Sequence, residues 1–331
     1  MRAFRYARAS DPVAAATLVA GTPDAAYLGG GTNLVDLMKL GVLRPGLLVD
    51  VSRLPYDAVD HRPDGGVLIG GAVRNSQLVV DEGIRRRYPA VARAVLAGAA
   101  GQVRSQATVA GNLMQRTRCP YFQNTGTPCN KREPGSGCSA IAGAHRDLAV
   151  IGTSDACVAS HPSDLAVALA AYDAVVEVRR PDGIERLVSI HDLHRLPGDT
   201  PWIETVLDPG DLITGIQLPA SPVGALAAYR KVRDRWSYAF AVVSVAAVLR
   251  RDAGGRLDEV RLALGGVAPR PWRLWATERR LTGTDPDDDE VRAATRAAFA
   301  DARPLPDNAF KLELAADLVA AVLRDLRGAT R

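Results

Sequence analysis

Aromatic residues and basic runs are both scarce in this chain. Aromatic residues make up 5% of the 331 positions, and the formal net charge of +4 is spread along the sequence, with residues 85–87 as the one run of arginines. A groove that binds nucleic acid combines clustered basic side chains with aromatic platforms for the bases. The sequence therefore argues against nucleic-acid binding.

Long apolar runs are also missing. No segment reaches the roughly 20 apolar residues of a membrane-spanning helix, and the first residues are not followed by the apolar stretch of a secretory signal peptide. We therefore expect synthesis in the cytoplasm. Export to the periplasm as a passenger on a signal-bearing partner subunit would leave no mark in this chain.

Cysteine is rare, and its few positions are close together. The chain has four cysteines, Cys119, Cys129, Cys138 and Cys157. Two of them border a polar loop rich in proline and glycine, residues 128–138, which is unlike a hydrophobic core. Thiols grouped in this way indicate a metal, a cluster or a disulfide framework, and a reducing cytoplasm favours the first two.

The spacing of the cysteines does not choose the metal. Structural zinc sites contain close pairs of the form C-x₂₋₄-C, and ferredoxin clusters also use short spacings. The gaps here are longer than in either pattern. His145 and His161 flank or follow the cysteine loop, and we interpret both as structural.

The remaining composition is that of a folded protein with a large core, since 47% of residues are apolar and 24% are charged. Apolar segments of strand and helix type alternate from the start, which predicts an α+β fold. A Pro- and Gly-rich linker follows residue 218, and beyond it long apolar strands precede three helices. We predict two α/β subdomains, residues 1–58 and 59–219, and a C-terminal α+β domain of antiparallel sheet and helices, residues 225–331.

Two glycine-bearing segments are candidate binding loops. Gly29, Gly30 and Gly31 lie between a predicted strand and a predicted helix, where free backbone N–H groups can bind an anion such as a pyrophosphate. A plain tight turn explains the same residues equally well, and the spacing is not G-x-G-x-x-G. Residues 107–113 form a second glycine turn. Asp164 at a helix start reads first as part of a cap, and Lys231 as a solvated lysine.

The order of these motifs along the chain indicates a protein family more specifically than any one motif alone. Leu28-Gly29-Gly30-Gly31-Thr32-Asn33-Leu34, Ala107-Thr108-Val109-Ala110-Gly111-Asn112, Ser163-Asp164-Leu165 and Tyr229-Arg230-Lys231 occur in one sequence. In this order they resemble the FAD-binding subunit of the molybdenum hydroxylases, which include xanthine dehydrogenase, carbon monoxide dehydrogenase and aldehyde oxidoreductase. The cysteine loop further resembles the flavin subunit of bacterial periplasmic aldehyde oxidoreductases, which carries an additional [4Fe-4S] cluster.

The resemblance implies a site for each cofactor. It places the FAD pyrophosphate at Leu28, Gly29, Gly30, Gly31, Thr32, Asn33 and Leu34, with a second clamp at Thr108, Gly111 and Asn112. Asp164 would hydrogen-bond the cofactor, and Ile213 and Lys231 would lie near the isoalloxazine. The cluster ligands would be Cys119, Cys129, Cys138 and Cys157. Ala110 departs from the family pattern, in which a glycine is common.

The implied function is electron relay, with no catalytic residue for substrate chemistry in this chain. A molybdopterin-binding large subunit would oxidise an aldehyde, a small subunit with [2Fe-2S] clusters would pass the electrons on, and FAD would give them to an external acceptor. The [4Fe-4S] cluster would relay electrons or stabilise the loop, and we favour the second role. The alternatives are a free-standing FAD-dependent oxidoreductase and a metal-stapled scaffold subunit without redox function.

Overall fold

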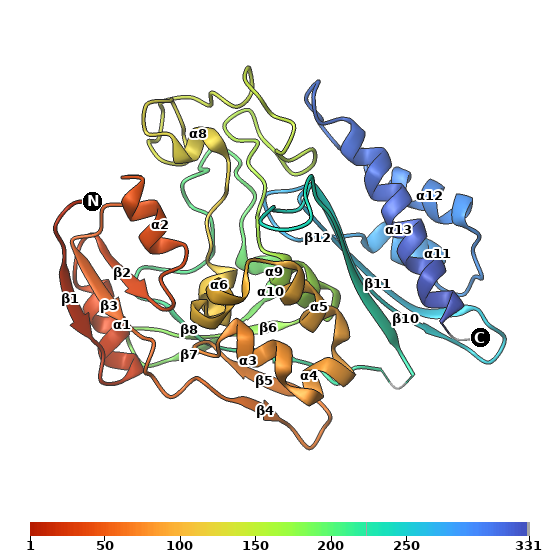
Figure 1. The fold of residues 1–331 in the computed structure, drawn as a ribbon, viewed down its shortest axis with the longest axis horizontal. Coiled ribbons are helices and arrows are strands. Elements are labelled where there is room, and N and C mark those ends of the chain that lie inside the picture. Colours follow the sequence, from red (N-terminus) through yellow and green to blue (C-terminus); the bar gives the residue numbers. More distant parts are fainter. Residues whose placement is uncertain (223, 330–331) are drawn as a thin grey trace.

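The computed structural model describes residues 1–222 and 224–329, and it contains three β-sheets that follow one another along the chain. The first sheet is parallel, with strand order β1-β3-β2. Its strands are β1 (Arg5–Arg8), β2 (Ala25–Leu28) and β3 (Leu47–Asp50), and its helices are α1 (Pro12–Ala20) and α2 (Leu34–Lys39). Figure 1 shows this unit at the left, with α2 directed toward the middle of the molecule.

The second sheet is antiparallel, with order β4-β5-β8-β6-β7. Its strands are β4 (Val59–His61), β5 (Val67–Gly70), β6 (Val175–Arg179), β7 (Glu185–Ser189) and β8 (Leu212–Leu218). The helices around it are α3 (Asn75–Val80), α4 (Glu82–Arg87), α5 (Pro89–Ala97), α6 (Gly101–Gln106), α7 (Val109–Leu113), α8 (Pro120–Gln123), α9 (Asp164–Ala171) and α10 (Ile190–Leu193).

Helix α9 is the centre of the packing. All eight of its residues are buried, and it packs against α5 on one side and against β10 and β11 of the third sheet on the other. A helix that is apolar all round is stable only in such a fully buried position. Its N-cap, Ser163, accepts a hydrogen bond from the Ala166 N–H, which fixes where Asp164 enters the site.

The third sheet is antiparallel, with order β12-β11-β10-β9, and helices cover one of its faces (Figure 1). The strands are β9 (Leu226–Val232), β10 (Val243–Arg251), β11 (Leu257–Gly265) and β12 (Trp272–Arg273). The helices are α11 (Trp275–Leu281), α12 (Asp288–Ala297) and α13 (Phe310–Gly328). Helix α13 packs its buried face, which includes Val319 and Leu323, on β10 and β9.

The predicted α+β class and the order of α/β subdomains before an antiparallel C-terminal domain are confirmed. The domain boundaries themselves stay a prediction, and residues 223 and 330–331 of the predicted linker and third domain lie outside the described residues. One predicted detail differs. The second glycine turn is the N-terminus of helix α7.

Residues 114–163 form a long connection between α7 and α9 with little regular structure. Its regular structure consists of helix α8 and two isolated β-bridges, Cys129–Cys138 and Ser154–Cys157. The connection has a small core of its own, in which Phe122 and Leu148 pack with the cysteines and with Leu37 of α2. It therefore joins the first subdomain to the rest. Among the described residues, no helix has the length and apolar character needed to cross a membrane.

Candidate functional site: two cavities at the glycine turns and a cysteine cluster

The two glycine-bearing segments predicted from the sequence are packed directly against each other. A Cβ atom on Gly29 would lie 2.9 Å from Thr108 Oγ1, and a Cβ atom on Gly30 would overlap the backbone carbonyl of Gln106. Gly31 has φ +73°, a left-handed conformation that favours glycine. The glycines are therefore required by the contact between the two segments.

A cavity of about 260 Å³, here called the central cavity, opens beside this contact. The predicted residues that line it are Thr32, Asn33, Gly111, Asn112, Asp164 and Lys231. Asn75, Gln115, Arg118 and Tyr238 also line it and were not predicted. No family motif or spacing marks these four in the sequence, although Arg118 does precede the first cysteine.

Two buried polar atoms at the central cavity have no hydrogen-bond partner in the protein. These are Asn33 Nδ2, a donor, and Asn75 Oδ1, an acceptor. The other side of the Asn33 amide is engaged, because its Oδ1 accepts from the Arg116 backbone N–H at 2.9 Å. An unpaired buried polar group costs about 1–3 kcal/mol. The pair of amides is therefore suited to a polar ligand that offers both an acceptor and a donor.

The deep end of the central cavity is an ion pair. Lys231 Nζ donates to Asp164 Oδ2 at 2.8 Å, and Tyr229 Oη donates to Asp164 Oδ1 at 2.5 Å. Lys231 Nζ also donates to the Ala97 carbonyl at 3.2 Å. Burial, with the adjacent Asp164 carboxylate, raises the pKa of Tyr229 well above its usual value, so the phenol stays protonated and acts as a donor.

A second cavity, of about 140 Å³, lies on the other side of the glycine contact and is called the apolar cavity. Gly29, Thr108, Gly111 and Ile213 line it, together with apolar and aromatic side chains such as Leu54 and Tyr56. The structure therefore does not bring Ile213 and Lys231 together, since each lines a different cavity. Gly111 lines both.

The other predicted residues frame these cavities. Within the described part of the chain, Leu28, Gly30, Gly31 and Leu34 line neither cavity. Gly30 instead allows the turn to pack on the segment before α7, and Gly31 supplies the left-handed φ of the turn. Ala110, the departure from the family pattern, lines the apolar cavity, so its methyl group is accommodated there.

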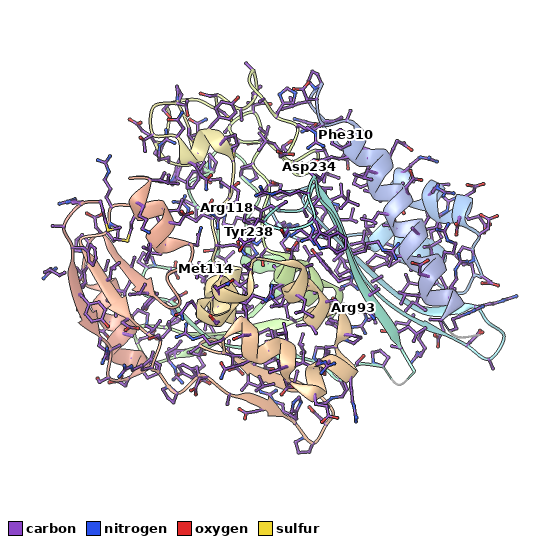
Figure 2. The ribbon with its side chains drawn as sticks, viewed as in Figure 1. Arg93, Met114, Arg118, Asp234, Tyr238 and Phe310 are labelled. Carbon is purple, nitrogen blue, oxygen red and sulfur yellow. The ribbon has the colours of Figure 1, made fainter. Side chains whose placement is uncertain are left out.

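An aromatic loop, residues 233–241, borders the central cavity. Asp234 at its start forms two hydrogen bonds to Arg146, of 2.9 and 2.8 Å, and the Arg118 guanidinium stacks on Phe240 at its end. Tyr238 adopts a left-handed φ of +53° and is 65% exposed, while Trp236 is 91% exposed. Figure 2 labels Arg118, Asp234 and Tyr238 in this region near the middle of the molecule.

All four cysteines line one narrow cavity, together with Lys131 and Asn130. None of them forms a disulfide. Burial raises the pKa of the Cys119 thiol to about 11 and also raises the pKa of Cys157. In residues 1–222 and 224–329, no three His, Cys, Asp or Glu side chains are arranged closely enough to hold a metal ion. The thiols converge, but the arrangement does not by itself form a metal centre.

Two protein families match successive parts of the chain and together cover nearly all of it. The FAD binding domain in molybdopterin dehydrogenase matches residues 2–221, and the CO dehydrogenase flavoprotein C-terminal domain matches residues 219–326. The aldehyde oxidoreductase FAD-binding subunit PaoB of Escherichia coli is 49% identical over 99% of both chains. The carbon monoxide dehydrogenase medium chain of Hydrogenophaga pseudoflava is 25% identical over 86% of this chain and 81% of that protein.

A solved structure shares the fold. The reconstituted CO dehydrogenase from Oligotropha carboxidovorans superimposes with a TM-score of 0.76 and 21% identity, over 99% of this chain and 98% of that chain. The chain belongs to the family of FAD-binding domains of molybdopterin dehydrogenases, and it is the FAD-binding oxidoreductase subunit of a molybdenum hydroxylase.

Proposed function

We propose that this chain is the FAD-binding electron-transfer subunit of a heterotrimeric, molybdenum-containing aldehyde oxidoreductase. The observation that carries the choice of aldehyde is the 49% identity with the aldehyde oxidoreductase subunit of E. coli over nearly the full length of both chains. The matched carbon monoxide dehydrogenase chain reaches only 25%. Its electrons would arrive from a [2Fe-2S] subunit and leave through FAD to an external acceptor.

The two cavities fit the two ends of FAD. In this placement the pyrophosphate lies where the two cavities meet, since Gly111 lines both of them and Gly29 lines the apolar cavity. The isoalloxazine occupies the central cavity near Lys231, and the adenine occupies the apolar cavity near Ile213. The unpartnered Asn33 and Asn75 amides support a polar ligand in the central cavity. When bound, FAD supplies the two-electron chemistry of this subunit.

The chain's own residues hold and orient the cofactor. Lys231 presents a cation whose charge is balanced by Asp164, so the pair adds little net charge to the cavity floor. Tyr229 fixes the second oxygen of the same carboxylate. The aromatic loop limits access of solvent at the rim, because Tyr238 and Phe240 line the cavity there. These residues position the flavin and shape the electrostatic field around it.

A [4Fe-4S] cluster held by Cys119, Cys129, Cys138 and Cys157 is the second part of the proposal. Four thiols converge, as such a cluster requires. Burial raises the pKa of Cys157, and the nearby Lys131 ammonium offsets part of this effect in favour of the thiolate that binds iron. Binding would require the thiols to move closer than in the structure. We propose that the cluster stabilises the 114–163 connection.

Iron and acid-labile sulfide analysis of the purified chain tests the cluster. We expect about four of each per chain, and a Cys129→Ser variant should lose most of both. A matched variant in the same loop, Thr125→Ala, changes an exposed residue and should keep them. Zinc in place of iron, or two disulfides in a non-reducing mass measurement, would contradict the cluster.

The assembly is the third part. We propose a molybdopterin-binding large subunit and a [2Fe-2S] small subunit as partners, with the compartment set by whichever partner carries an export signal: the periplasm with such a signal, the cytoplasm without one. The exposed aromatic side chains of the 233–241 loop, among them Trp236 and Tyr238, support a partner surface, since grouped apolar side chains on a surface mark interaction sites.

Aldehyde turnover tests the proposal as a whole. The chain purified alone should bind FAD and show no oxidation of aromatic or aliphatic aldehydes. Co-expressed with its two partners, it should reduce an artificial acceptor when an aldehyde is added. Turnover by the single chain would refute the proposal, and so would a complete complex that oxidises xanthine or carbon monoxide but no aldehyde.

A further inference from the structure

A third cavity, of about 310 Å³, lies between the flavin turn and the cysteine loop. We call it the histidine cavity, because His161 and His194 line it, with their ring centroids 4.2 Å apart and their planes tilted by 49°. His194 Nε2 donates to the Leu113 carbonyl at 3.0 Å, which leaves Nδ1 as the acceptor. Arg195 and Trp202, both exposed, also line the cavity, so it reaches the surface.

The two imidazoles carry buried nitrogen atoms without a partner in the protein. These are His194 Nδ1 and His161 Nε2. His194 is only 4% exposed. Buried polar groups are nearly always paired with protein or with water. The cavity volume is several times the roughly 30 Å³ of one water molecule, so it has room for water molecules that satisfy both nitrogens.

His161 also lines a fourth cavity, of about 220 Å³, which we call the connecting cavity. Asp164 lines both this cavity and the central cavity. The three cavities therefore adjoin: the histidine cavity meets the connecting cavity at His161, and the connecting cavity meets the central cavity at Asp164. Gln115 lines both the histidine cavity and the central cavity, so a neutral amide, which cannot take up a proton as an imidazole does, separates these two. Polar contacts bound the path, among them the Ser160 carbonyl, which accepts from Thr117 Oγ1 at 2.9 Å.

Charge around the pair keeps the imidazoles neutral. Burial, the neighbouring His194 and Lys131 lower the pKa of His161 well below its usual value, and burial lowers the pKa of His194. Glu204 does not face them as a free base, because Arg116 and Lys131 bind its two oxygens at 2.6 and 2.8 Å. A neutral imidazole has one donor and one acceptor nitrogen, so it can take up a proton on one side and release one on the other.

Reduction of a flavin requires a supply of protons. Two-electron reduction of a flavin is balanced by the uptake of up to two protons, which return to solvent when an acceptor removes the electrons. The central cavity is closed at its deep end by the Lys231–Asp164 pair, both of whose side chains are almost fully buried. Protons that reach the cofactor from that side must cross the protein.

We propose that the three adjoining cavities form a water-filled proton route from the surface at Arg195 and Trp202 to the flavin at Asp164, with His161 as the residue that transfers the proton between cavities. The route rests on FAD occupancy of the central cavity. His194 is a positioning residue, which packs against the His161 ring and keeps an acceptor nitrogen on the water path.

Flash reduction of the FAD-loaded chain, followed with a pH-indicator dye, tests the route. In the wild-type protein, proton uptake should keep pace with the loss of flavin absorbance. In His161→Gln, which preserves size and polarity, and in His161→Ala, uptake should slow about tenfold or more and show a larger solvent isotope effect. Added imidazole should accelerate uptake in His161→Ala, and the equilibrium midpoint potential should stay unchanged, because a route alters the rate only.

The control is His61→Leu, which removes a partly exposed histidine of β4 that lines none of these described cavities. Its proton uptake should match wild type. Uptake at the wild-type rate in both His161 variants, no response to imidazole, or loss of FAD from both variants would overturn the route. A wild-type chain that binds no FAD would instead refute the proposed function, so the two failures are distinguishable.

Discussion

The Lys231 ammonium lies 2.8 Å from the Asp164 carboxylate, and both side chains are almost completely buried at the floor of the central cavity. From the sequence, each was assigned separately to the cofactor, Asp164 as a hydrogen-bonding group and Lys231 as a cation beside the isoalloxazine. The structure makes them one unit. The positive charge offered to a reduced flavin is therefore partly balanced by the protein itself.

Replacing Lys231 alone should lower the free energy of unfolding more than replacing Lys231 and Asp164 together by uncharged residues. Lys231→Met leaves a buried carboxylate with only the Tyr229 hydroxyl as partner, and breaking a buried pair in this way costs about 3–5 kcal/mol. The double variant Lys231→Met with Asp164→Asn keeps the bond from Tyr229 without a charge and should recover part of that loss. Urea unfolding of the two variants measures the difference.

The control for this comparison is Lys39→Met, which removes an exposed lysine and should change the unfolding midpoint little. Equal destabilisation by the single and the double variant would mean that Asp164 does not carry an uncompensated charge. The ion pair would then be unimportant to the fold.

Gly30→Ala should destabilise the protein through a contact inside the chain, before any effect on the cofactor. The added methyl group meets the Gln106 backbone carbonyl, and overpacking of this kind costs about 1–3 kcal/mol or more. Gly101→Ala is the matched control, because nothing lies within 4 Å of its added Cβ. Thermal unfolding of both variants without FAD decides it: similar midpoints would show that the two glycine segments are not packed as described.

Lys311 should make stability depend on pH between about 8 and 10.5. Burial lowers its pKa from 10.5 to about 8, while the ammonium donates to the carbonyls of Leu148 and Gly266 at 2.9 Å each. Above the lowered pKa the folded state holds fewer protons than the unfolded state, so the free energy of unfolding rises with pH across this window, by up to about 3 kcal/mol.

Lys311→Met isolates this effect. The variant loses two hydrogen bonds at every pH, but it also loses the titration. The unfolding free energy of the wild type minus that of the variant should therefore increase from pH 8 to pH 10. A difference that stays constant or shrinks with pH would show that the buried lysine keeps an ordinary pKa.

The sequence predicted the elements with strong local signals. The strand at Ala25–Leu28, the helix that Gly41 follows and the helix beginning at Asp164 lie where glycine, caps and apolar periodicity place them. Local signals could not reveal that Gly30 packs on Gln106, because that contact joins segments far apart in the chain. The turn predicted around Gly111 is instead the first turn of helix α7, where the Thr108 side chain caps the helix by accepting a hydrogen bond from the Gly111 N–H.

The sequence could predict which residues belong to the site, but not how those residues are arranged around the cavities. The resemblance named Ile213 and Lys231 as neighbours of one ring, and only the fold separates them into two cavities. Asn75 and Tyr238 carry no motif, since their place at the cavity depends on how α3 and the 233–241 loop pack. His161 was interpreted as structural, because the unpaired nitrogen that suggests a proton route is visible only with His194 beside it.

Chromatography of the cofactor released from the purified chain tests the central claim most directly. A pyrophosphate at the glycine turns, an isoalloxazine near Lys231 and an adenine near Ile213 predict FAD, at about one per chain. FMN has an isoalloxazine but no adenine to fill the apolar cavity. Recovery of FMN at full occupancy, or of no flavin at all, would contradict the account.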